Sequence, residues 1–226
     1  MLLIENFPRV LAIGAHPDDI EIGAGGFIHR LTSKYRAHVH FLVLTEGVQG
    51  PVRQHAYRGS TRRAEAFKAA KLLKVAREDV TVLKFPDCQL HEQEHALIRE
   101  IEARLYGEDG RANFDIILSH AGEDTHADHR ATYEATLSAA RSFPGAVLHY
   151  QAPSTKPNGF RPTFFVRLDK KSIKQKNRAI QAHISQRNKA FMQESRTVGM
   201  ANNWALFHRQ PSGTYLEAFE VYKSFF

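Results

Sequence analysis

Short apolar runs rich in Val, Ile, Leu and Phe alternate with segments of helical period over the first 150 residues. Such runs predict buried strands, and the segments between them carry apolar residues on one side and charges on the other. This alternation is typical of successive βαβ units and predicts a Rossmann-like α/β fold with a parallel sheet flanked by helices. The expected strands are Val10–Ala15, Val39–Leu44, Val80–Phe85, Ile116–Ser119 and Ala146–Tyr150, and the expected helices are Phe27–Tyr35, Arg62–Leu73, Glu94–Tyr106 and Arg130–Ala140.

The pattern changes after residue 150. Pro153, Pro157 and Gly159, followed by Pro162, predict a loop over Gln151–Arg161, which we expect to border the functional site. Beyond it the expected elements are a strand (Thr163–Leu168), a helix (Lys171–Gln186), a mixed segment around Trp204 and a last strand (Glu217–Tyr222). Because these segments keep apolar patterns, we expect a smaller C-terminal α/β extension that packs on the sheet, and a single domain over residues 1–226.

The composition narrows the class of protein only in part. The chain has 226 residues, of which 42% are hydrophobic and 24% charged, and a net charge of +7. That charge suits an anionic partner, but a solvated helix face explains the basic residues between Lys156 and Arg209 equally well. The first eight residues lack the features of a signal peptide, and no apolar stretch is long enough to span a bilayer, so we expect a cytoplasmic protein. Cys88 is the only cysteine, which excludes an internal disulfide and a thiolate zinc site.

Two clusters of histidine and aspartate carry the candidate chemistry. Ala15-His16-Pro17-Asp18-Asp19 follows the first strand, before glycines at 23, 25 and 26 that we expect to form a turn opening a helix. Asp124-Thr125-His126-Ala127-Asp128-His129 follows the fourth strand. Because parallel strands end at the same edge of a sheet, we expect the clusters to converge. Either cluster alone is typical of a helix N-cap with surface histidines, but together they favour a zinc site that activates water for hydrolysis, most naturally of an amide.

The residues leave several roles open. Adjacent carboxylates leave the backbone in different directions, so one of Asp18 and Asp19 binds the metal and the other accepts a proton. One of His126 and His129 binds the metal while the other faces the substrate. Two further carboxylates of the second cluster either orient these imidazoles or cap the following helix, namely Asp124 and Asp128.

The first cluster with Glu21–Gly26, and the motif Asp124-x-His126-x-Asp128-His129-Arg130, resemble the zinc-dependent LmbE-like, or PIG-L, N-acetylglucosaminyl deacetylases. Weaker matches extend the resemblance over nearly the whole chain: Arg62-x-x-Glu65 with Ala69, Pro86-Asp87, Lys176 to Gln186, and Glu217-Ala218-Phe219-Glu220. The resemblance implies that a cytoplasmic enzyme uses Zn²⁺ to remove an N-acetyl group from an amino sugar or its conjugate. Some family members form hexamers, so a homo-oligomer stays open.

The resemblance also implies a role for each site residue. Zinc would be bound by His16, Asp19 and His129, with Asp18 as the general base and His126 as its partner acid. Sugar contacts would come from Arg62 and Asp87, although an ion pair between loop and helix explains those two residues equally well. The chain departs from the family where Thr45-Glu46-Gly47-Val48 replaces the common Thr-x-Gly-Glu, because a valine then stands in place of a glutamate that contacts substrate.

The sequence leaves three alternative functions to consider. A zinc amidase could cleave a different acyl group from a sugar conjugate or from an antibiotic or thiol precursor. A dinucleotide-binding protein is disfavoured because Asp18 and Asp19 would repel a pyrophosphate at the first turn. A nucleic-acid-binding module using Arg58, Arg62, Arg63 and Lys170–Arg187 is disfavoured because no recognition helix or stacking pattern accompanies the charge. We interpret His183 as a buried, hydrogen-bonded histidine that stabilises the fold and not as a metal ligand.

Overall fold

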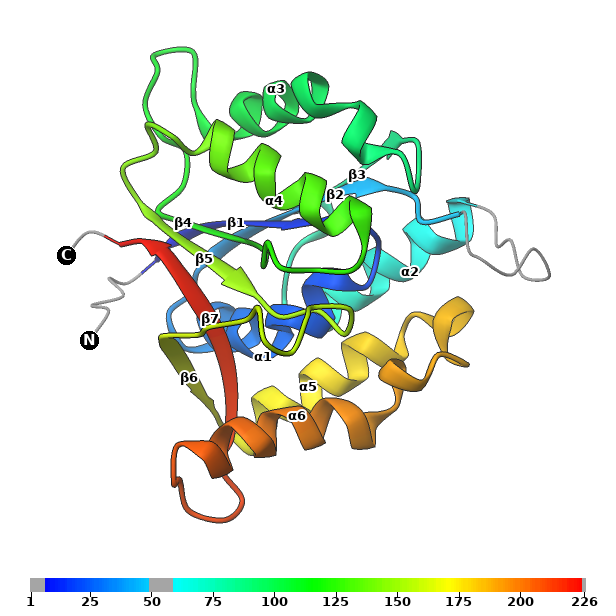
Figure 1. The fold of residues 1–226 in the computed structure, drawn as a ribbon, viewed down its shortest axis with the longest axis vertical. Helices are drawn as coiled ribbons and strands as arrows, with labels where there is room; N and C mark the ends of the chain where they lie inside the picture. The colour runs from blue at the N-terminus through cyan, green and yellow to red at the C-terminus, as the bar shows by residue number, and fades with distance from the viewer. Residues whose placement is uncertain (1–6, 49–58, 225–226) are drawn as a thin grey trace.

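A seven-stranded sheet forms the centre of the part of the chain that the structure describes, residues 7–48 and 59–224 of a computed structural model (Figure 1). Its strand order is β3-β2-β1-β4-β5-β7-β6. The strands β1 to β5 pair in parallel, whereas β7 pairs antiparallel with both β5 and β6. The strands are β1 (Arg9–Gly14), β2 (His38–Thr45), β3 (Val80–Phe85), β4 (Ile116–His120), β5 (Ala146–Tyr150), β6 (Phe164–Leu168) and β7 (Tyr215–Lys223).

Helices cover both faces of this sheet. Figure 1 shows α3 and α4 on one face and α1, α2 and α5 on the other, with α6 packed beside α5 and β7. The described helices are α1 (Asp19–Lys34), α2 (Gly59–Leu72), α3 (Glu94–Leu105), α4 (Ala127–Ala139), α5 (Lys170–Gln181) and α6 (Glu194–Phe207). Short 3₁₀ turns lie at Arg77–Asp79, Leu90–Glu92, Ile184–Gln186 and Ala190–Met192. The expected α/β fold with a flanked sheet is therefore confirmed.

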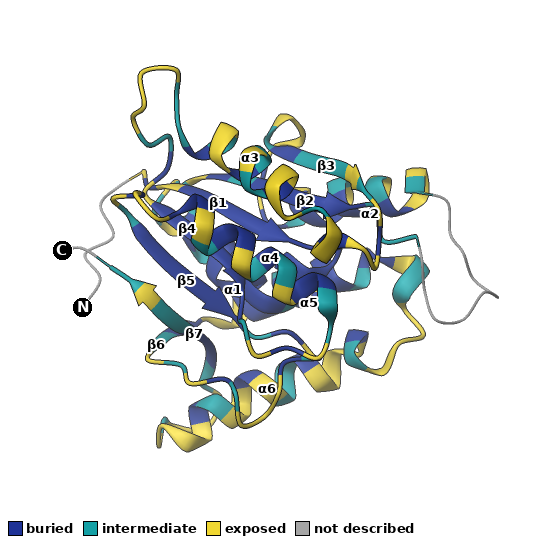
Figure 2. Ribbon diagram, turned by 45° about the horizontal axis from the view of Figure 1, so that its top comes forward, coloured by how far each residue is buried: buried dark blue, intermediate teal, exposed yellow. Residues whose placement is uncertain are grey.

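The central strands are buried on both faces, which explains their uninterrupted apolar sequence. In β1, Val10 and Ala12 point into the apolar core under α1, α2 and α5. Their neighbours Leu11 and Ile13 point into the core under α3 and α4. Figure 2 shows the central strands almost entirely buried and much of α6 exposed. A strand buried on both sides needs apolar residues at every position, so its sequence loses the alternation of a half-buried strand.

The expectation of a glycine-rich turn before the first helix is wrong. Helix α1 begins at Asp19, so the three glycines lie within it. The physical reason is close packing, because a Cβ added at Gly23 would overlap the ring of Tyr150, and one at Gly26 would overlap Leu168. These glycines let α1 approach the strands that carry the functional site.

The C-terminal extension packs on the sheet as expected, but some of its details differ. Its strands β6 and β7 join the edge of the main sheet through β5, in addition to the packing of its helices on the sheet. The expected helix over Lys171–Gln186 ends at Gln181, and the mixed segment around Trp204 is the regular helix α6. Within the described ranges, no helix is long and apolar enough to cross a membrane. Arg58, named in the nucleic-acid alternative, lies outside the described residues.

The close approach of α1 gives a first prediction. We expect Gly23→Ala to lower the free energy of unfolding by about 1–3 kcal/mol, because the added methyl group must displace the Tyr150 ring. The matched substitution Gly199→Ala in α6 meets no atom within 4 Å, so it should raise stability by about 0.5–1 kcal/mol. Urea unfolding of both variants checks this, and equal effects at the two positions would contradict the packing explanation.

Candidate active site

The two clusters of histidine and aspartate meet at the carboxyl edge of the sheet, as expected. Strands β1 and β4 are parallel neighbours, and their register pairs Val10 with Ile116. The first cluster follows β1 and the second follows β4, so both leave the sheet at the same edge. The rings of His16 and His129 therefore lie 5.5 Å apart, although the two residues are 113 positions apart in the chain.

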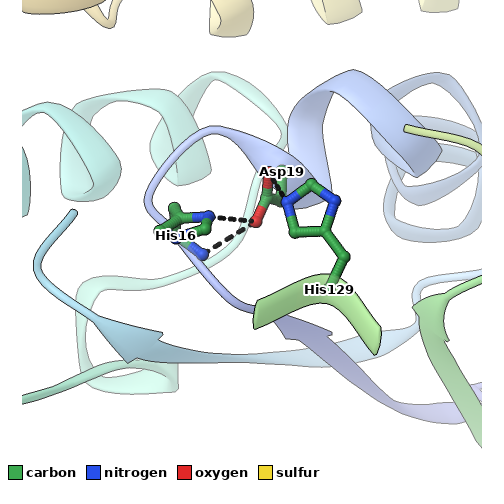
Figure 3. Close-up of side chains that lie close together, drawn as sticks. All are labelled: His16, Asp19 and His129. Carbon is green, nitrogen blue, oxygen red and sulfur yellow. Dashed lines mark hydrogen bonds and ion pairs between the residues drawn. The ribbon is translucent and has the colours of Figure 1, made fainter. Parts of the chain in front are cut away.

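A buried triad of potential metal ligands occupies this edge (Figure 3). His16 precedes α1, Asp19 begins α1, and His129 lies in the first turn of α4. His16 Nδ1 is 3.2 Å from Asp19 Oδ2, and His129 Nε2 is 3.4 Å from Asp19 Oδ1. One ligand atom from each residue lies within 4.8 Å of the other two. The three side chains thus converge with the donor types and spacing that a zinc ion requires.

Each imidazole of the triad has a carboxylate on its outer nitrogen. His129 Nδ1 donates to Asp124 Oδ2 at 3.1 Å, and Ser154 Oγ lies 3.1 Å from the same nitrogen. His16 Nε2 lies 3.2 Å from Asp128 Oδ2 and 3.1 Å from Asp87 Oδ1. Outer carboxylates of this kind fix the tautomer of a ligating histidine and turn its free nitrogen toward the metal.

The charges of the cluster also suit a divalent cation. Burial opposes protonation of His129, but the charge of Asp19 and the hydrogen bond to Asp124 raise its pKa to about 9. The pKa of His16 is likewise raised against burial by hydrogen bonds to Asp128, Asp19 and Asp87. Burial alone would raise the pKa of Asp19, yet His129 and His120 lower it well below its ordinary value. Without a metal, protons on the imidazoles balance the carboxylates, and a bound cation would take over that charge.

Other combinations of ligands fit less well. His16, His126 and Asp128 also lie close enough to share an ion, as do Asp87, Cys88 and Asp128. Asp128, however, already accepts the backbone N–H groups of Cys88 at 2.7 Å and Leu90 at 3.1 Å. Its two oxygens therefore already form hydrogen bonds with the loop after β3 and with His16.

Asp18 occupies a strained position beside the triad. It is the N-cap of α1 and has φ 121° and ψ −25°, a backbone conformation that residues other than glycine rarely adopt. Arg62 of α2 donates from Nη2 to Pro17 O at 2.8 Å and from Nη1 to Asp18 Oδ2 at 3.4 Å. The arginine therefore holds both the backbone before Asp18 and its carboxylate.

His126 lies against both histidines of the triad. Its ring centroid is 4.8 Å from that of His16 and 4.6 Å from that of His129. As the N-cap of α4, its Nδ1 accepts the backbone N–H of Asp128 at 3.2 Å. Burial lowers its pKa, and the nearby imidazoles lower it further. The cap therefore favours a neutral ring with its proton on Nε2, where it can donate a hydrogen bond.

The two expected sugar contacts lie deeper than a substrate-binding residue usually does. Arg62 is only 2% exposed and Asp87 only 4%. For Arg62 the structure shows the expected alternative, an ion pair between helix and loop, because the arginine of α2 pairs with Asp18 at 3.4 Å. Asp87 instead lies 3.1 Å from His16 Nε2. Both side chains thus contact residues of the candidate site, and very little of either is exposed.

Sequence reasoning missed two residues of this site. His120 ends β4, and its ring stacks on His129 with a centroid separation of 4.0 Å. Its Nε2 lies 3.2 Å from both the backbone N of Ala15 and Asp19 Oδ2, and burial lowers its pKa to about 4. Its position directly at a strand end is a signal that could have identified it. Ser154, which reaches His129 from the loop after β5, had no such signal.

His183 is buried as expected, but it lies in the turn after α5 instead of within the expected helix. It is fully buried behind the site, and its Nε2 lies 3.3 Å from Glu21 Oε1 in α1. Two residues along, Ser185 donates from N and Oγ to Glu65 in α2, at 2.8 and 2.6 Å. The turn after α5 thus joins α1 to α2 at the base of the site.

The protein has a sheet covered by helices on both faces, with two histidines and a carboxylate after two neighbouring parallel strands. This arrangement is typical of α/β enzymes that have a metal centre at the carboxyl edge of the sheet. The chain belongs to the PIG-L family, described as GlcNAc-PI de-N-acetylase, whose model matches residues 11–140. This match contains both clusters. An uncharacterized deacetylase of Escherichia coli (strain K12), YaiS, is 31% identical over 179 residues, which cover 78% of this chain and 90% of the relative. The family assignment supports an enzyme that removes acyl groups.

Solved structures agree on the fold. The N,N'-diacetylchitobiose deacetylase of Pyrococcus horikoshii superposes with a TM-score of 0.73 and 21% identity, covering 95% of this chain and 83% of that one. The 4-carboxy-2-hydroxymuconate hydratase GalB of Pseudomonas putida KT2440 superposes with a TM-score of 0.71 and 19% identity, covering 97% and 98%. At these identities the likeness shows the fold alone, and the fold serves more than one reaction.

Proposed function

We propose that the protein is a zinc-dependent N-deacetylase that hydrolyses the acetamido group of an N-acetylglucosamine-type sugar or its conjugate. The observation that carries the proposal is the buried His16–Asp19–His129 triad, whose outer nitrogens are held by carboxylates. The family match and the deacetylase relative support the reaction class. The proposed products are acetate and a free amine.

His16, Asp19 and His129 would hold the zinc ion, and bound zinc supplies a water of lowered pKa and polarises a carbonyl. Asp124 keeps His129 in the tautomer that offers Nε2 to the metal. Asp128 and Asp87 do the same for His16 and leave its Nδ1 facing Asp19.

Asp18 is the proposed general base. Its carboxylate adjoins Asp19 in the chain and is held by Arg62, so it accepts the proton of the attacking water from a fixed position. The departing nitrogen needs one proton to leave as an amine, and the proton taken up by Asp18 meets that need. The carboxylate thus returns to its charged form after each turnover.

His126 is the proposed donor to the oxygen of the substrate carbonyl. Its Nδ1 is occupied by the N–H at the start of α4, so its Nε2–H is available as a donor. A hydrogen bond to an oxygen that gains negative charge in the transition state is worth more than the same bond to the ground state. This role uses the neutral imidazole that the helix cap favours.

The proposed function is tested by amine release from N-acetylated sugars. Fluorescamine would detect free amine from N-acetylglucosamine, its phosphates and N,N'-diacetylchitobiose, before and after treatment with EDTA and after zinc is restored. We expect chelation to remove nearly all activity and about one zinc per chain to restore it. Amine release that survives removal of the metal would contradict the zinc proposal. If a zinc-loaded protein leaves every acetyl sugar intact, analogues with longer N-acyl groups test the alternative of a different amidase.

A further inference from the structure

An apolar pocket lies beside the candidate active site, between α6, the start of β7 and the loop after β5. Its cavity volume is about 80 Å³, enough for a short alkyl chain or one aromatic ring. Figure 1 shows α6 and β7 beside the segment that leaves β5. The apolar lining comes from Ile22, Pro153, Phe191, Met200, Trp204 and Leu216.

The buried charged groups at this pocket are paired with each other. Lys176 Nζ lies 2.6 Å from Glu217 Oε1, and both side chains are buried. Glu217 also accepts the backbone N–H groups of Gly26 and Phe27. Arg196 is exposed at the rim. A pocket whose buried ions are already paired and whose walls are apolar favours an uncharged apolar ligand.

Three connections place the pocket next to the triad. Ile22 comes three residues after Asp19 in α1, so their Cβ atoms are about 5–6 Å apart on neighbouring turns. Pro153 lines the pocket, and the next residue, Ser154, contacts His129 at 3.1 Å. Leu216 lies beyond the carboxyl end of β5, because the antiparallel register pairs Tyr150 with Phe219.

The sheet gives the distance between the two places. The triad follows β1 and β4, whereas the pocket lies after the end of β5 and at the start of the antiparallel strand β7, so the two places are about two strands apart in the order β1-β4-β5-β7. Two strand spacings correspond to about 10 Å. The glycosidic carbon of an N-acetylated hexosamine is bonded directly to the carbon that bears the acetamido group. An aglycone can therefore enter the pocket while the acetamido group lies at the triad.

We propose that this pocket is a subsite for an apolar aglycone, a short alkyl chain or single aromatic ring, carried by the sugar substrate. The proposal rests on the proposed deacetylation and adds the class of conjugate that the enzyme prefers. Trp204 is the only tryptophan of the chain and lines the pocket, with its Nε1 donating to Gln151 Oε1 at 3.3 Å. Its fluorescence thus reports occupancy of the pocket independently of catalysis.

The test uses the zinc-loaded full chain and the methyl, propyl and hexyl β-glycosides of N-acetylglucosamine. We expect kcat/KM to rise about fourfold for each methylene that enters the pocket, and to level off once the cavity is filled. The Trp204 emission should shift to shorter wavelength with the hexyl glycoside and stay unchanged with the methyl glycoside. N,N'-diacetylchitobiose, whose second sugar is polar, should gain no such advantage over the methyl glycoside.

Two matched variants on α6 locate the effect. Met200→Lys places a charge at the pocket, and Leu206→Lys places one on the same helix outside it; the two side chains are 43% and 71% exposed. We expect Met200→Lys to abolish the rise of kcat/KM with chain length, and Leu206→Lys to leave that rise unchanged.

The possible failures are distinguishable. If the methyl glycoside is deacetylated but chain length has no effect, or the two lysine variants behave alike, the subsite proposal is overturned and the proposed function stands. If rates rise with the length of the N-acyl group instead of the aglycone, the assignment to an aglycone is also overturned. If no glycoside releases amine, the proposed function fails, and a chain-length-dependent shift of Trp204 emission that Met200→Lys abolishes would still support the pocket. Absence of that shift would overturn it.

Discussion

Asp18→Asn is expected to lower kcat about a thousandfold while the protein keeps its zinc. The substitution preserves the size of the side chain but removes the basic oxygen, and general-base catalysis contributes about 10²–10⁴ in rate. The triad of His16, Asp19 and His129 does not include Asp18, so metal content should stay unchanged. Metal analysis and steady-state kinetics on the same preparation check both parts. Retention of more than a tenth of the wild-type kcat would exclude Asp18 as the base.

Arg62 extends this prediction from the base to the residue that holds it. The guanidinium contacts Pro17 O and Asp18 Oδ2 and is almost completely buried, which suits a positioning residue rather than a sugar contact. We expect Arg62→Met to lower kcat about 10–100-fold with KM nearly unchanged, since displacement of a catalytic group by about 1 Å can cost a hundredfold. The matched control is Arg63→Met, which removes only a partly exposed pair with Glu46.

A double-mutant cycle separates positioning from substrate contact. If Arg62 acts through Asp18, adding Arg62→Met to Asp18→Asn should lower kcat by less than about threefold further. If Arg62 contacts the sugar, KM should rise in both backgrounds and kcat should be little changed. Thermal unfolding of each variant, with Arg62→Lys as a milder substitution, establishes that the compared proteins are folded.

The core of the fold could be predicted because its strands are buried on both faces. Runs such as Val39–Leu44 admit few other interpretations between amphipathic helices, and the connections between strands then fix a common edge. The start of α1 could not be predicted, because glycine is read as a turn signal unless the facing side chain is known. Here that side chain is Tyr150, more than a hundred residues away. Local pattern cannot reveal a helix that needs glycine for a distant contact.

The composition of the site was predictable, but the orientation of its groups was not. The residue pattern alone left His126 and His129 interchangeable. In the structure, the N-cap geometry turns His126 Nδ1 toward the N–H of Asp128, and Asp124 turns His129 Nε2 toward Asp19. Both differences depend on where α4 begins, a boundary that sequence patterns define poorly. Arg62 was likewise visible as a motif, while its contacts with Pro17 O and Asp18 depend on where the fold places α2 relative to the segment between β1 and α1.

His129→Ala is expected to abolish zinc binding, the second large effect. The substitution removes one of three protein ligands. It also removes the hydrogen bond that His129 Nδ1 donates to Asp124. Zinc content should fall from about one per chain to nearly none after dialysis, and added zinc should raise the melting temperature of the wild type but not of the variant. Inductively coupled plasma mass spectrometry and thermal scans with and without zinc measure these outcomes.

Two further variants distinguish loss of a ligand from general damage to the site. Asp124→Asn should weaken zinc affinity about 10–100-fold without abolishing binding, because it disturbs the carboxylate that orients His129 and leaves all three ligands in place. His126→Gln should keep the wild-type affinity and lower kcat, since His126 is adjacent to the triad but is not one of its ligands. Affinities follow from competition with a chromophoric chelator. A His129→Ala protein that binds zinc as tightly as the His126→Gln protein would exclude the triad as the metal site, whereas the expected order would separate the residues that bind, orient and react.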